Sequence, residues 1–146
     1  MSTETVHFIG VGGVGMSGIA RVAHDQGMAV SGSDLKESRY TKQLRDAGIT
    51  VFIGQDGANI PEGDPMVVVS TAILENNPEL IAAKERGLAI RHRAQMLAHL
   101  GRNLDTLAVA GTHGKTTTTS MLASTLDAMG ADPTFLIGGI VRAYGT

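Results

Sequence analysis

Short apolar runs alternate with helix-type patterns through residues 6–100. Five runs are typical of buried strands, because a strand covered on both faces of a parallel sheet is apolar throughout. They lie at residues 6–10, 28–33, 49–53, 66–70 and 88–91. Between most of them, apolar side chains recur every three or four residues, and glycines at 27, 48, 87 and 101 mark the expected helix ends. The pattern predicts an α/β fold with a mostly parallel, Rossmann-like sheet and helices on both faces.

A polar, turn-like stretch at residues 101–105 ("GRNLD") separates this pattern from a second one. Beyond it, "TLAVAG" at residues 106–111 reads as a strand, and a glycine-rich loop then leads into a helix that carries Met121, Leu122 and Leu126 on one side. We therefore expect one domain over residues 1–101 and the beginning of another over residues 102–146.

Composition excludes several classes of protein. Apolar residues make up 42% and charged residues 18% of the chain, which rules out a disordered chain. A net charge of −2 and 3% aromatic residues do not indicate nucleic-acid binding. No apolar run approaches the length of a membrane span, and no cysteine is present. We expect a cytoplasmic protein that binds neither nucleic acid nor a membrane.

The first glycine-rich loop, "GVGGVG", carries Gly10, Gly12 and Gly15 in G-x-G-x-x-G spacing between an expected strand and helix. Glycines let the main chain approach a diphosphate, and the positive end of the helix holds the negative charge. Asp34, at the end of the second expected strand, has the place of the acid that usually binds a ribose. A tight turn without a ligand, and capping of a turn by Ser33 and Asp34, remain open. NAD(P) and a nucleotide sugar would both suit the loop.

The second glycine-rich loop, "AGTHGKTTTT", departs from the usual phosphate-loop pattern, because only Thr112 and His113 separate Gly111 from Gly114. Even so, backbone amides would surround phosphates, Lys115 would reach the outer phosphates, and the Thr116 hydroxyl would bind Mg²⁺. The alternative is a threonine-rich helix start with a surface lysine. We assign His113 no proton-transfer role, and His7, His24, His92 and His99 do not have the spacing of a metal site.

Two loops of different kinds in one chain are a more specific signal than either loop alone. With them, the stretches "HFIGVGGVGMSGIA", "SGSD", "VVVSTAI", "NPE", "RAQMLA" and "DPTF" resemble the Mur ligases, the ATP-dependent amide-forming enzymes of peptidoglycan synthesis. The resemblance covers nearly the whole chain in the expected order. Gln55 is a departure, because the family more often has a histidine there.

The resemblance implies that residues 1–101 bind the UDP part of UDP-N-acetylmuramate, and that residues 102–146 begin the central ATP-binding domain. The implied UDP-sugar residues are Gly12, Gly13, Val14, Gly15, Ser33, Asp34, Ser70, Thr71 and Ala72. The implied ATP residues are Gly111, Thr112, His113, Gly114, Lys115, Thr116 and Thr117, with Lys115 catalytic and Thr116 on Mg²⁺.

The implied reaction activates the muramyl carboxylate as an acyl phosphate, which the amine of L-alanine then attacks, in a pathway that serves cell-wall biogenesis, cell shape and cell division. Members of the family are about three times this long, so we expect a fragment that binds UDP-sugar but does not ligate. The alternatives are a family member that attaches recycled tripeptide, whose first loop typically differs from "GVGGVGMSG", an NAD(P)-dependent oxidoreductase, and a nucleotide-sensing module.

Overall fold

The computed structural model describes residues 3–137, and the chain divides into two compact units. The first runs from Met1 to Asn103 and the second from Leu104 to Thr146.

The first unit is built on a five-stranded sheet in the order β3-β2-β1-β4-β5. Its strands are β1 (Thr5–Ile9), β2 (Ala29–Asp34), β3 (Thr50–Ile53), β4 (Met66–Val69) and β5 (Ile90–His92). Every pair of neighbours is parallel. The carboxyl ends of all five strands therefore lie at one edge of the sheet, which is where ligands bind in open parallel sheets. The predicted parallel α/β fold is confirmed.

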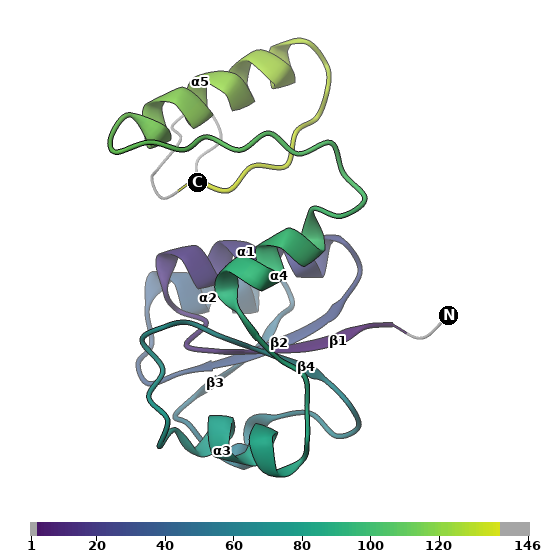
Figure 1. Cartoon of the computed structure of the whole chain (residues 1–146), viewed down its shortest axis with the longest axis vertical. Helices are drawn as coiled ribbons and strands as arrows, with labels where there is room; N and C mark the ends of the chain where they lie inside the picture. The colour runs from purple at the N-terminus through teal and green to yellow at the C-terminus, as the bar shows by residue number, and fades with distance from the viewer. Residues whose placement is uncertain (1–2, 138–146) are drawn as a thin grey trace. The chain divides into compact units, whose positions relative to one another are not determined.

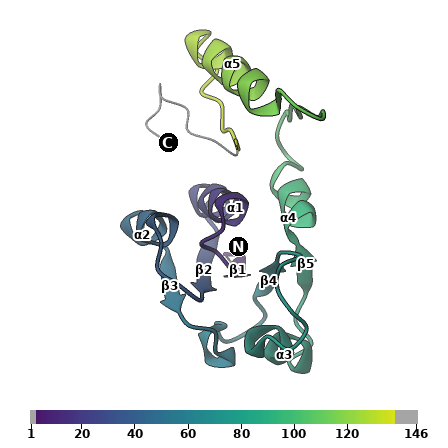
Figure 2. The same cartoon turned by 90° about the vertical axis from the view of Figure 1, so that its left-hand side faces the viewer.

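Helices cover both faces of this sheet (Figures 1 and 2). One face carries α1 (Val14–Asp25), α2 (Arg39–Asp46) and α4 (Arg93–Leu100), and the other carries α3 (Pro78–Glu85), with the short helix η1 (Gly57–Asn59) packed against α3. The Asn77 side chain caps α3 by accepting hydrogen bonds from the amides of Glu79 and Leu80.

Apolar side chains pack on both faces of the sheet. Phe8 of β1 lies opposite Val68 of β4, and both are fully buried. Side chains alternate along a strand, so the neighbours of Phe8 point to the opposite face. There Ile9, Val67 and Val69 pack with residues of α3 and of the adjoining loops.

Two polar residues are buried between the sheet and α3. His7 of β1 and Glu79 of α3 have no exposed surface, and their Nε2 and Oε1 atoms lie 2.9 Å apart. Glu79 Oε2 accepts a hydrogen bond of 2.5 Å from the Ser33 hydroxyl, and His7 Nδ1 lies 2.8 Å from the Ser31 hydroxyl. With the proton on Nε2, His7 donates to Glu79 and accepts from Ser31. Every polar side-chain atom of this cluster then has a partner, as burial requires.

The second unit contains one helix among its described residues, α5 (Lys115–Ala128), which follows the second glycine loop. The strand predicted at residues 106–111 is not formed, and this stretch has no regular secondary structure. A strand needs a neighbour to bond its backbone groups, and no described part of residues 104–137 pairs with it. Leu107 is accordingly 66% exposed.

None of the helices among the described residues is long and apolar enough to cross a membrane.

The buried cluster generates a stability prediction. In Glu79→Ala, the ring of His7 and the hydroxyl of Ser33 lose their shared acceptor inside the protein, and the free energy of unfolding should fall by about 3–5 kcal/mol. Urea unfolding followed by circular dichroism measures this loss. The matched control is Glu85→Ala, an exposed acid on the same helix, whose effect should stay within about 0.5 kcal/mol. Equal midpoints for the two variants would contradict the role given to the cluster.

Candidate functional site

The first glycine loop lies where β1 ends and α1 begins, at the carboxyl edge of the sheet. The amides of Gly10 and Val11 each donate a hydrogen bond of 2.9 Å to the carbonyl of Ser33 at the end of β2. Gly10 has a φ of +79°, a left-handed conformation that glycine adopts without strain. The loop therefore turns sharply away from β1 and is fixed to the neighbouring strand.

Asp34 organises the same loop through its carboxylate. Its Oδ2 atom accepts a hydrogen bond of 2.8 Å from the Gly12 amide. A Cβ atom added at Gly12 would lie 2.8 Å from that oxygen and 3.0 Å from Cγ2 of Thr41. Gly12 thus has to be glycine because of the protein's own packing. Its amide is already bound, so it is not free to donate to a diphosphate in this conformation.

Ser33, which the resemblance places among the UDP-sugar residues, has no exposed side-chain surface, and its hydroxyl donates to Glu79. Its carbonyl accepts from the loop amides of Gly10 and Val11. Ser33 therefore holds the loop in place, and its side chain has no surface left for a ligand in this structure.

The amino end of α1 is open, unlike those of α2 and α3. Side chains of Ser38 and Asn77 cap α2 and α3, whereas no side chain caps α1 at Gly13. The first amides of a helix have no acceptor within the helix. Gly13 and Val14 are exposed and Gly15 is partly exposed, so this positive helix end is accessible to an anion.

The segment after β4 lies close to the first loop. Ser70 is partly exposed, Thr71 and Ala72 are exposed, and the Ser70 hydroxyl accepts from the Ala72 amide at 3.3 Å. A Cβ atom at Gly10 would lie 3.2 Å from Cδ1 of Ile73, which follows directly. The structure thus brings together the three segments that the sequence singled out, after β1, β2 and β4.

In the second unit, Gly114 precedes α5 with a φ of +79°. The Lys115 ammonium group donates a hydrogen bond of 2.5 Å to the carbonyl of Gly111 and so closes the loop on itself. No side chain caps α5. Residues 111–117, among them Thr112, His113, Thr116 and Thr117, are all exposed. The loop presents the uncapped first amides of α5, one lysine and three hydroxyls, which are groups that hold phosphates and a divalent cation.

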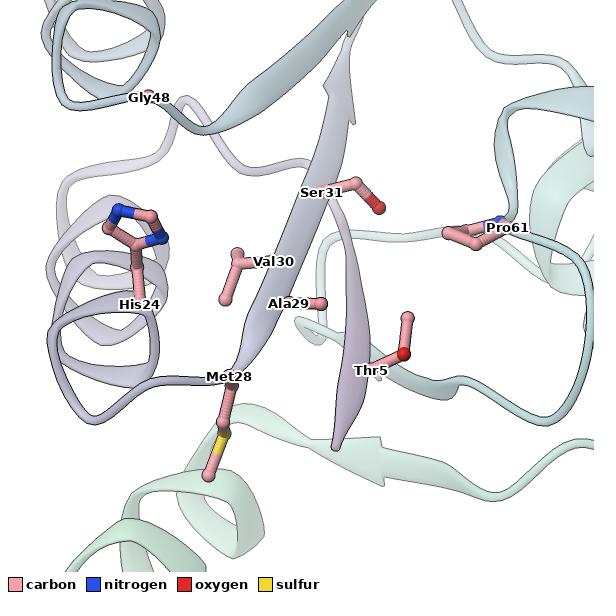
Figure 3. A pocket seen from close by; sticks show the side chains of 8 residues that line it. All are labelled: Thr5, His24, Met28, Ala29, Val30, Ser31, Gly48 and Pro61. Carbon is pink, nitrogen blue, oxygen red and sulfur yellow. The ribbon is translucent and has the colours of Figure 1, made fainter. Parts of the chain in front are cut away.

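The surface pocket in Figure 3 lies elsewhere. Thr5 begins β1 and Ala29 begins β2, so the pocket is at the amino ends of the strands, opposite the glycine loop. His24 and Pro61 line it from opposite faces of the sheet. None of the residues that line this pocket is among the site residues predicted from the sequence.

Sequence reasoning missed the residues that support the loop from a distance. His7 and Glu79 are 72 positions apart, and neither of them was assigned a role at the site from the sequence. Arg93 of α4 lies against Gly15, whose Cβ would be 2.5 Å from Arg93 Nη1. The glycine spacing signals that something approaches Gly15 closely, but spacing alone does not identify Arg93 as the neighbour.

A parallel sheet with a glycine loop between β1 and an uncapped α1 defines an α/β domain of the Rossmann-like class. The chain belongs to the Mur ligase family. The family model described as "Mur ligase family, catalytic domain" matches residues 5–104.

Curated relatives are similar over nearly the whole chain. The chain is 57% identical over 141 residues to the UDP-N-acetylmuramate--L-alanine ligase of Agrobacterium fabrum and 54% identical over 142 residues to that of Xanthobacter autotrophicus. Each match covers 97% of this chain and 30% of the relative. The chain therefore spans less than a third of the length of these relatives.

Solved structures agree with the fold. The UDP-N-acetylmuramate-alanine ligase of Thermotoga maritima matches with a TM-score of 0.87 and 35% identity, over 95% of this chain and 33% of that one. The UDP-N-acetylmuramate:L-alanyl-gamma-D-glutamyl-meso-diaminopimelate ligase from Neisseria meningitidis matches with a TM-score of 0.89 and 37% identity, over 99% of this chain and 46% of that one.

The packing at Gly12 can be tested with a matched pair of variants. Gly12→Ala should push the Asp34 carboxylate away from the loop and lower the free energy of unfolding by about 1–3 kcal/mol. Gly13→Ala is the control, because its Cβ meets no atom closer than 3.6 Å and its φ is −69°. That variant should change stability by about 1 kcal/mol or less. Urea unfolding measures both, and an equal loss in the two would disprove the close approach.

Proposed function

We propose that this chain is the N-terminal part of an ATP-dependent ligase that joins L-alanine to UDP-N-acetylmuramate in peptidoglycan synthesis. The observation that carries the proposal is the identity of 54–57% to curated ligases of that name, over 97% of the chain. This identity extends through both glycine loops, so it favours the alanine ligase over an oxidoreductase, which would have no use for the second loop. The family relative that attaches a recycled tripeptide remains the alternative within the family.

In the proposal, the first unit binds the UDP part of the sugar nucleotide. The amides of Val14 and Gly15 face the diphosphate at the positive end of α1, beside the exposed backbone of Gly13, whose own amide donates a long hydrogen bond of 3.4 Å to the Gly10 carbonyl. The Gly12 amide stays bonded to Asp34, so Gly12 contributes only the absence of a side chain, which lets the backbone of the loop approach the diphosphate closely. The other oxygen of Asp34, Oδ1, accepts only a long hydrogen bond of 3.4 Å from the Lys36 amide and can also accept from the nucleoside. Residues 70–72 line the same edge of the sheet after β4.

In the second unit, residues 111–117 fit the phosphates of ATP. Gly114 can take the left-handed turn that aims the amides of α5 outward, and Lys115 already lies on the loop. The Thr116 hydroxyl is exposed and is free to bind Mg²⁺. Bound Mg²⁺ would supply neutralisation of phosphate charge during transfer. Lys115 adds a fixed positive charge beside the transferring group, where electrostatic positioning provides most of the catalysis.

The reaction needs ATP because an ionised carboxylate is a poor acyl donor. A carboxylate oxygen of the muramyl group bonds to the γ-phosphorus of ATP, and ADP leaves. The amine of L-alanine then bonds to the acyl carbon, phosphate leaves, and the amine loses a proton. The two loops thus have separate roles, since one holds the acceptor sugar nucleotide and the other holds the phosphoryl donor.

The whole reaction belongs to a longer protein in this proposal, since each matched relative is more than three times the matched length. We expect the described residues to bind UDP-N-acetylmuramate without ligating it. The cytoplasmic location and the links to cell-wall biogenesis, cell shape and cell division follow from the proposed reaction and stay predictions.

Titration calorimetry of the chain tests the first part of the proposal. UDP-N-acetylmuramate should bind at least about a hundredfold more tightly than NADH, a difference of about 2.7 kcal/mol. UDP serves as the matched ligand without the sugar, and it should retain most of the affinity. Tight binding of NADH with no heat from the UDP-sugar would overturn the proposal in favour of the oxidoreductase.

The role of Lys115 is testable in a full ligase that carries this chain as its N-terminal part. Lys115→Ala should lower the ligation rate at least about a hundredfold, because one fixed charge on the transferring group is lost. Affinity for UDP-N-acetylmuramate should change less than about twofold, because that ligand is assigned to the other loop. Lys42→Ala removes an exposed lysine from α2 and is the control. An unchanged ligation rate in Lys115→Ala would remove Lys115 from the mechanism.

A further inference from the structure

Arg93 is a cation at the carboxyl edge of the sheet. It is the first residue of α4, directly after β5, and α4 packs against α1. Its guanidinium group lies over the first turn of α1. A Cβ atom added at Gly15 would be 2.5 Å from Nη1 and 3.5 Å from Cζ. A side chain at position 15 would therefore displace the Arg93 guanidinium group from this place.

The charge of Arg93 is not neutralised by the protein. Among residues 3–137 the exposed Arg93 side chain forms no ion pair and no hydrogen bond, whereas Arg21 of α1 pairs with Asp25 and Arg45 of α2 pairs with Glu37. The neighbouring group is the positive end of α1, which no side chain caps. A cation beside the amino end of a helix is unfavourable, because the exposed amides carry positive charge of their own.

Asp34, the acid of this loop, is bonded to the Gly12 amide, and no acid pairs with Arg93 or caps the start of α1. An anion that binds both Arg93 and the first amides of α1 explains why these two positive groups lie together. We propose that Arg93 binds the diphosphate of the sugar nucleotide, together with the amides at the start of α1. The inference rests on the proposed function of the first loop and adds a side chain to a site that otherwise consists of backbone. Arginine suits this place, since its planar fork can donate two parallel hydrogen bonds to phosphate oxygens.

The same placement accounts for the missing side chain at Gly15, whose amide is still available to the ligand. In the first loop, Gly12 makes room for Asp34 and Gly15 makes room for Arg93. Both glycines accommodate side chains that come from other strands or helices. The spacing of the loop glycines is thus matched to an acid on one side and a base on the other, with the open end of α1 between them.

The test compares Arg93→Gln with Arg21→Gln. Both variants remove one positive charge, but Arg21 is exposed on α1 and paired with Asp25. Titration of the chain with UDP-N-acetylmuramate and with UDP should show a loss of about tenfold to a hundredfold for Arg93→Gln, the range expected for charged hydrogen bonds. Arg21→Gln should bind within about twofold of the unchanged protein. Arg93→Lys keeps the charge without the fork and should fall between them.

Thermal unfolding separates binding from structure. Because Arg93 opposes the positive end of α1, Arg93→Gln should leave the Tm of the free protein unchanged or slightly higher. A lowered Tm with unchanged affinity would overturn the inference and make Arg93 a structural residue. Equal affinities for Arg93→Gln and Arg21→Gln would also overturn it while leaving the proposed function intact. If the unchanged protein binds neither UDP nor the UDP-sugar, the proposed function itself fails, and this inference with it.

Discussion

The buried carboxylate of Glu79 joins the segments that support the first glycine loop. It comes from α3 and accepts from His7 of β1 and Ser33 of β2, so one buried group joins a helix to two strands. Ser33 in turn holds the loop amides of Gly10 and Val11 through its carbonyl. Removing water from a carboxylate is costly unless its oxygens are bonded. The position of the glycine loop and the packing of α3 are therefore settled by the same set of hydrogen bonds.

This arrangement gives the residues of the loop different roles from those that a motif assigns. The amide of Gly12 is bound to Asp34, and the side chain of Ser33 is buried, so neither offers a free group to a ligand. What remains accessible is the uncapped start of α1 with Gly13, Val14 and part of Gly15. The loop is thus a rigid support whose outer turn alone faces the solvent. Rigidity of this kind favours binding, because little ordering remains to be done when an anion arrives.

The sequence was sufficient to place the strands and main helices of the first unit along the chain, because apolar runs and glycines at helix ends reflect local constraints. The start of α3 was also readable, because Asn77 caps the helix through contacts within three residues. Contacts between distant segments were not readable: nothing near His7 indicates Glu79, and nothing near Gly15 indicates Arg93. The strand expected at residues 106–111 failed for a related reason, since strand formation depends on a partner and not only on apolar side chains.

The two loops obtain their positive charge in different ways, which explains why a motif finds one cation and misses the other. In the second loop, Lys115 is part of the motif and lies on the Gly111 carbonyl four residues before it. In the first loop the motif contains no charged residue, and the unpaired Arg93 reaches the loop from α4, late in the sequence of the unit, through the packing of α4 on α1. The first loop consequently depends on the complete fold of its unit, whereas the second carries its lysine within a single turn. If α4 no longer packed on α1, the first loop would lose Arg93 although its glycine motif would be unchanged.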